Sequence, residues 1–203
     1  MSNFRQKITL PGIPDDMFIR GDVPMTKSEI RALTMAKARI SDGAVIYDIG
    51  AGTGSLSIEA ALLAPNGKVY AIEKEEDAVA LIKENRAKFS VSNLIVIHGT
   101  APEALEDLPP ADVVLVGGSG KNLKDIIQIV HAKLKEGGTV VFNSITLETL
   151  AITFEMLSRV LNYQTEVINV HIDRLIPMGS KHGFKSLNPI YIISAHKEAQ
   201  EIG

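Results

Sequence analysis

Short apolar runs alternate with helical patterns along most of this chain, and the alternation constrains the fold more than any other feature. The runs are rich in β-branched residues and almost continuously apolar, which is typical of parallel strands covered by helices on both faces. The runs occupy residues 44–49, 68–73, 94–98, 112–116 and 139–143, and the helical patterns occupy 55–64, 75–89, 121–134 and 147–161. This order predicts a doubly wound α/β fold.

The C-terminal part follows a different pattern. Residues 164–176 and 189–196 read as strands, and residues 177–188 read as a long loop between them. Because no helical pattern separates the two strands, we expect an antiparallel hairpin. The sequence therefore predicts a mostly parallel, seven-stranded, Rossmann-like sheet that ends in an antiparallel hairpin strand.

Length and composition narrow the possibilities further. A chain of 203 residues suits one domain, 1–203, in which an arm (1–25) precedes a helix (26–40) that begins with the capping-box pattern Thr26-Lys27-Ser28-Glu29. Cysteine is absent and the histidines lack metal-ligand spacing, so we expect no disulfide and no metal. The net charge of -3 argues against nucleic acid or a membrane as partner. We recognise no signal peptide or membrane span, so we expect a cytoplasmic protein.

A glycine-rich turn after the first run carries the chemistry. It consists of Asp48, Gly50, Ala51, Gly52, Thr53 and Gly54. Glycines at alternate positions let a ligand lie against the backbone, and Glu73 at the end of the second run can accept hydrogen bonds from ribose hydroxyls. Either a dinucleotide or S-adenosylmethionine fits. The spacing G-x-G-x-G, with Ser55 where a dinucleotide site has its last glycine, favours S-adenosylmethionine and hence a class I methyltransferase. The alternative is a tight turn without a ligand.

Three further groups are candidates. Ala101, after the third run, could give its backbone N–H to the adenine ring. The stretch Gly117, Gly118, Ser119 and Gly120 ends the fourth run, where it would face the reacting methyl group and leave bare backbone for a bulky substrate. Arg174, Lys181 and Lys185 form a basic cluster that could bind an anionic substrate. The alternatives are an ordinary loop, a turn without substrate contact, and surface cations.

Several segments together resemble the decarboxylating precorrin-6Y (cobalt-precorrin-6B) C-15 methyltransferases of cobalamin biosynthesis. The segments are residues 13–18, 23–31, 48–54, 99–105, 116–120 and 188–189. The resemblance implies methylation of carbon 15 of a corrinoid precursor, with loss of carbon dioxide from the acetate on carbon 12. It also implies a homotetramer. Cofactor contacts carry over to Thr26, residues 50–54, Glu73 and Ala101.

The resemblance leaves some questions open. The chain has no fused second methyltransferase domain, which favours the anaerobic route and cobalt-precorrin-6B as the substrate. The sulfonium methyl is already activated, so the chemistry demands no strong acid or base, and we assign no catalytic residue. A methyltransferase of another substrate, such as a protein carboxylate or tRNA, and a non-catalytic nucleoside-binding module remain the alternative functions.

Overall fold

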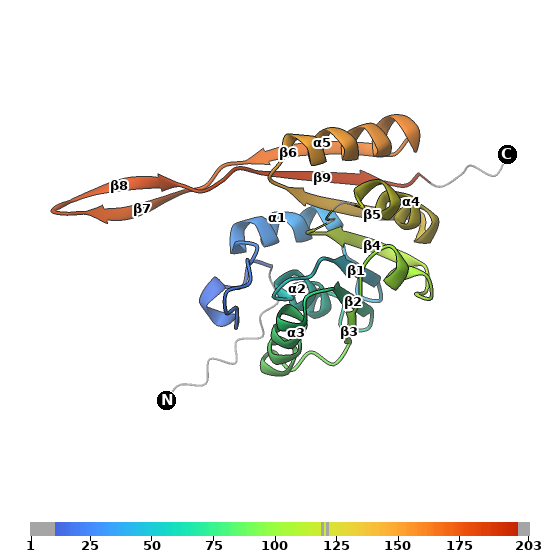
Figure 1. Cartoon of the computed structure of the whole chain (residues 1–203), viewed down its shortest axis with the longest axis horizontal. Coiled ribbons are helices and arrows are strands. Elements are labelled where there is room, and N and C mark those ends of the chain that lie inside the picture. Colours follow the sequence, from blue (N-terminus) through green and yellow to red (C-terminus); the bar gives the residue numbers. More distant parts are fainter. Residues whose placement is uncertain (1–10, 119, 121, 199–203) are drawn as a thin grey trace.

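The computed structural model describes residues 11–118, 120 and 122–198 (Figure 1). A seven-stranded sheet runs in the order β3-β2-β1-β4-β5-β9-β6, and β7 and β8 form a separate two-stranded sheet. The strands are β1 (Val45–Ile49), β2 (Lys68–Glu73), β3 (Leu94–His98), β4 (Ala111–Val116), β5 (Leu134–Ser144), β6 (Gln164–Val170), β7 (Asp173–Met178), β8 (Lys181–Ser186) and β9 (Ile190–His196). The helices are α1 (Ser28–Ala38), α2 (Ser55–Leu63), α3 (Glu76–Lys88), α4 (Leu123–Lys133) and α5 (Leu147–Phe154).

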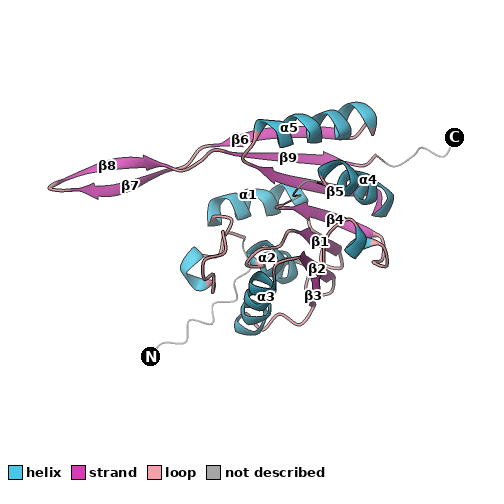
Figure 2. Cartoon of the chain, viewed as in Figure 1, coloured by secondary structure: helices cyan, strands magenta, loops and turns pink. Residues whose placement is uncertain are grey.

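The predicted Rossmann-like sheet is confirmed. Strands β3, β2, β1, β4 and β5 pair in parallel, and β9 pairs antiparallel with both β5 and β6. Side chains alternate between two cores: Ile46 packs with α1, α2 and α3, whereas Tyr47 packs with α4 and the segment after α5. Helices therefore cover both faces of the sheet (Figure 2).

The direction in which the chain adds strands to the sheet reverses after β3, next to β1. Strand β1 pairs with β2 on one side and with β4 on the other, so the connections after β1 and β4 leave in opposite directions. The backbone N–H of Gly117 still reaches Ile49 O at 3.0 Å, which holds the two strand ends together. In open α/β sheets such a switch point at the carboxyl ends of the strands is where ligands bind.

The prediction of a long loop at 177–188 is wrong. The strand predicted at 164–176 is divided into β6 and β7, and β8 lies inside the predicted loop. Strands β7 and β8 form a hairpin closed by a turn at Gly179 and Ser180. The hairpin projects from the molecule (Figure 1), and from here on the arm means this hairpin, residues 173–186, and not the N-terminal segment 1–25. The signal of the hairpin in the sequence is weak because the side chains of β8 are mostly polar and exposed.

Other boundaries differ more modestly. Helix α1 starts at Ser28, and its N-cap residue Lys27 makes no side-chain capping bond, so the predicted capping box is wrong. Glu29 instead bonds to Ser28 Oγ and to Arg174 on the arm. The helix predicted at 147–161 continues beyond α5 as a π-helical turn, Glu155–Val160. No helix in the described part of the chain is long and apolar enough to cross a membrane.

Candidate functional site

The glycine turn after β1 has the backbone geometry that its sequence predicts. Gly50 has φ +71°, and a Cβ there would lie 2.6 Å from the carbonyl oxygen of Gly118. Gly54 has φ +76°, and a Cβ there would meet Ile82 of α3 at 3.0 Å. Side chains are therefore excluded at both ends of the turn, and the main chain itself forms the surface that a ligand would contact.

Glu73 lies beside this turn, at the end of β2. Its Oε2 accepts the N–H of Gly52 at 2.8 Å, and its Oε1 accepts the N–H groups of Lys74 and Glu75 at 2.8 and 3.0 Å. The side chain is only 7 % exposed. A carboxylate has about four lone-pair sites, so it retains acceptor capacity for a ligand hydroxyl.

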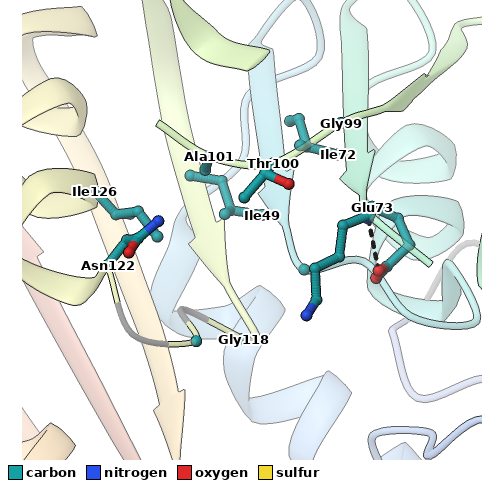
Figure 3. A pocket seen from close by; sticks show the side chains of 12 residues that line it. Ile49, Ile72, Glu73, Gly99, Thr100, Ala101, Gly118, Asn122 and Ile126 are labelled. Carbon is teal, nitrogen blue, oxygen red and sulfur yellow. Dashed lines mark hydrogen bonds between the residues drawn. The ribbon is translucent and has the colours of Figure 1, made fainter. Parts of the chain in front are cut away.

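A cavity of about 350 Å³ opens beside Glu73, and we call it the β2 cavity (Figure 3). Glu73 and Ile126 stand on opposite sides of it, with Thr100 and Ala101 between them. Ile49, Ile72 and Ile126 give it an apolar part, and Gly50 and Gly118 give it a backbone part. An apolar pocket beside a carboxylate that can accept hydrogen bonds suits a nucleoside, and a contact between Glu73 and a ribose stays a prediction.

A second cavity, of about 520 Å³, lies on the other side of the glycine turn, and we call it the N-terminal cavity. It also contacts Gly50, so the two cavities are adjacent. Its lining includes Thr26 and Lys27 before α1, and Leu187 and Asn188 after the arm. The predicted contact residue Thr26 is thus placed near Ala51, Gly52 and Thr53, which also line this cavity.

A buried ion pair holds the segment before α1 in place. Arg31 Nε lies 2.7 Å from Glu59 Oε1, and both side chains are almost completely buried. Arg31 also binds Asp15 and the carbonyl oxygens of Ile13 and Thr26, while the Glu59 carboxylate accepts the N–H groups of Gly12 and Ile13. No local pattern in the sequence predicts this network, because a single Arg in a helical pattern gives no signal of burial.

A third cavity, of about 220 Å³, lies over the ends of β4 and β5, and we call it the β5 cavity. Gly117, Gly118 and Gly120 line it, as do Asn143, Thr146 and Thr149. The candidate Ser119 lies outside the described residues. Asn143 was not predicted, although it lines both the β5 cavity and the N-terminal cavity.

Asp48 lines none of these three cavities. It is fully buried, and its Oδ2 accepts a hydrogen bond from Ser57 Oγ in α2. Burial raises the pKa of Asp48 to about 6, the Ser57 hydrogen bond opposes this shift, and the nearby Glu73 charge adds to it. The position suits a role in holding the glycine turn against α2, and a contact with a cofactor stays a prediction.

The basic cluster does not gather around a loop at the site. Lys181 and Lys185 stand on β8 of the projecting arm, and they line none of the three cavities. Arg174 on β7 pairs with Glu29 at 2.6 Å, so its charge is used to tie the arm to α1. Because β7 and β8 pair in the projecting arm, these cations lie away from the three cavities. Their contact with a substrate stays a prediction.

Comparison with known proteins shows which family the chain belongs to. The model of a family described as a precorrin methyltransferase domain matches residues 16–197. The chain belongs to this precorrin methyltransferase family. A probable cobalt-precorrin-6B C(15)-methyltransferase (decarboxylating) of Sulfurisphaera tokodaii is 44 % identical over 191 residues, which cover 93 % of this chain and 98 % of that protein. The cobalt-precorrin-6B C(15)-methyltransferase (decarboxylating) of Salmonella typhimurium is 36 % identical over 93 % of this chain and 97 % of its own.

A solved structure agrees with these relatives. The crystal structure of a precorrin-6y C5,15-methyltransferase from Geobacter metallireducens superposes with a TM-score of 0.86 at 41 % identity, and the match covers 92 % of this chain and 98 % of that one. The resemblance noted in the sequence is therefore confirmed over nearly the whole chain, and this precorrin methyltransferase is a decarboxylating methyltransferase by family.

Proposed function

We propose that this chain methylates carbon 15 of cobalt-precorrin-6B and removes the carboxyl group of the acetate on carbon 12, with S-adenosylmethionine as the methyl donor. Relatives of nearly equal length carry this activity in their names, which supports the assignment. The structural observation that carries it is the meeting of three cavities at Gly50, Gly117 and Gly118, beside the Glu73 carboxylate. A cofactor and a large substrate could approach each other there.

The residues present fit S-adenosylmethionine. Glu73 accepts three backbone N–H groups and retains about one acceptor site for a ribose hydroxyl, and Ala101 and Ile126 line the β2 cavity in which the base would lie. The side-chain-free turn at Gly50 and Gly52 leads from there into the N-terminal cavity, where the amino-acid part would lie near Thr26. When bound, the cofactor supplies a methyl group that is already activated as a sulfonium.

The chain's own contribution is then alignment and exclusion of water. The buried pair of Arg31 and Glu59 fixes the segment before α1 that forms one wall of the N-terminal cavity. The bare backbone at Gly117 and Gly118 leaves room for the edge of a macrocycle. Positioning of this kind can supply a large part of a rate enhancement without an acid or a base.

A homotetramer belongs to the same proposal, and the arm supports assembly with further copies of the chain. Leu175, Met178 and Phe184 on β7 and β8 are 62 %, 61 % and 71 % exposed. Apolar side chains on a projecting hairpin are typical of an interface. Replacing Leu175 and Phe184 with Ser should shift the mass in light scattering toward the monomer, and an unchanged mass would exclude the arm from the interface. A cytoplasmic location stays a prediction.

The function is tested by incubating the protein with methyl-labelled S-adenosylmethionine and cobalt-precorrin-6B. We expect label in the corrinoid and release of carbon dioxide. Label transferred instead to tRNA or to a protein carboxylate would indicate a methyltransferase of another substrate. Retention of S-adenosylhomocysteine with transfer to none of these acceptors would indicate a nucleoside-binding module.

A further inference from the structure

The wall shared by the N-terminal cavity and the β5 cavity contains one polar side chain with unused hydrogen-bonding groups. The residues common to both cavities are Gly117, Asn143, Ser144 and Ile145. Ser144 Oγ is already occupied, because it donates to Thr146 O and accepts from Thr146 N, both at 3.1 Å. Ile145 is apolar. Asn143 is therefore the side chain on this wall that is best able to bind a polar ligand group.

Thr34 fixes which way the Asn143 amide faces. The Thr34 hydroxyl is fully buried and has one proton, for which two acceptors compete: Ile30 O at 2.7 Å and Asn143 Oδ1 at 3.2 Å. The shorter bond takes the proton. Thr34 Oγ1 then accepts from Asn143 Nδ2 at 3.0 Å. One N–H of the amide is thus anchored, and the second N–H remains for a ligand.

The surroundings of Asn143 favour an anion. No Asp or Glu occurs among the described residues that line the N-terminal cavity and the β5 cavity, and Lys27 is the charged side chain among them. A carboxylate that entered here would meet N–H donors and the Lys27 ammonium group, which lies 3.6 Å from Asp15 but shares that carboxylate with Arg31. The corrinoid substrate of the proposed reaction carries such carboxylates on its side chains.

We propose that Asn143 binds a side-chain carboxylate of the corrinoid substrate through its free Nδ2–H, and that Thr34 is a positioning residue that acts through Asn143. This inference rests on the proposed function. It gives the β5 strand end a role in substrate recognition that is separate from the cofactor contacts at Glu73 and Gly50.

The test compares four variants for methyl transfer to cobalt-precorrin-6B and for binding of S-adenosylhomocysteine by calorimetry. Asn143→Ala should lower kcat/KM about 10-fold or more, mainly through the KM for the corrinoid, because a hydrogen bond to a charged group is lost. Asn143→Asp should be worse than Asn143→Ala, because its carboxylate repels that of the substrate. Thr34→Val should resemble Asn143→Ala, and Thr34→Ser, which keeps the hydroxyl, should restore most of the activity.

A matched control separates this role from a general loss of packing. Thr153 is also fully buried, its hydroxyl has no partner among the described residues, and it lines none of the three cavities. Thr153→Val should leave the KM for the corrinoid unchanged. The double variant Asn143→Ala/Thr34→Val should lose no more activity than Asn143→Ala alone, because both changes remove the same contact.

Three results would overturn the inference while leaving the proposed function intact. These are an Asn143→Asp enzyme as active as Asn143→Ala or more so, losses at Thr34 and Asn143 that multiply, or a parallel loss of S-adenosylhomocysteine affinity. If the wild-type protein binds S-adenosylhomocysteine but leaves the corrinoid unmethylated, the proposed function fails and the inference falls with it.

Discussion

Replacing Glu73 with Gln removes one charge and one acceptor oxygen while keeping the size of the side chain. Both carboxylate oxygens accept backbone N–H groups, Oε2 from Gly52 and Oε1 from Lys74 and Glu75. An amide has a single oxygen, so in either orientation its NH2 group faces a backbone N–H. The variant therefore loses an acceptor for the ribose and also one contact that holds the glycine turn.

The size of the effect follows from these contacts. A hydrogen bond to a charged group contributes roughly 1.5–3 kcal/mol, so the affinity for S-adenosylhomocysteine should fall roughly 10- to 150-fold. The lost backbone contact is also made to the charged carboxylate, so its loss should lower the free energy of unfolding by ~1.5–3 kcal/mol. Titration calorimetry measures the first quantity, and denaturant unfolding without ligand measures the second.

Glu75→Gln is the matched control. Glu75 lies two positions after Glu73, and its exposed carboxylate pairs with Lys74 Nζ at 3.2 Å. It should bind S-adenosylhomocysteine as the wild type does. Wild-type affinity in Glu73→Gln would refute the placement of the ribose. An equal loss in both variants would refute a specific hydrogen bond and indicate a general effect of charge.

Three other changes test the parts that support the site. Gly50→Ala should lower the unfolding temperature and abolish binding of S-adenosylhomocysteine, because its Cβ would lie 2.6 Å from Gly118 O at a φ of +71°; an unchanged melting curve would contradict the close approach. Arg31→Met should lower the free energy of unfolding by about 3–5 kcal/mol, since Glu59 would remain buried without its partner, and a second change of Glu59 to Gln should recover part of the loss in denaturant titrations. Burial raises the pKa of Asp48 from 3.8 to about 6, so the folded chain binds this proton more tightly than the unfolded chain does. The contribution of Asp48 to stability should therefore fall by about 2 kcal/mol as the pH rises from 4 to 6, and by about 3 kcal/mol over the whole range from about pH 3 to 7. Asp48→Asn should lack this component of the pH dependence in unfolding titrations at each pH.

The parallel part of the sheet could be predicted because its signals are local. The runs at 44–49 and 112–116 match β1 and β4 to within one residue, since a buried parallel strand is apolar along most of its length. The glycine turn could be predicted for the same reason, because positive φ at Gly50 and Gly54 is set by the residue itself. The start of α1 was harder to predict from the sequence, because Glu29 has a second partner, Arg174, that only the folded arm brings near.

The remaining parts of the site depend on contacts between distant residues, which no local pattern encodes. Asn143 and Thr34 are separated by 109 positions, and each reads as an ordinary residue at a strand end or in a helix. Their pairing arises because α1 packs against the end of β5. The proposed cofactor contacts are mainly backbone groups and Glu73, which a local sequence pattern can indicate. The proposed substrate contacts are side chains from α1 and β5, so a single sequence predicts the cofactor class more readily than the substrate.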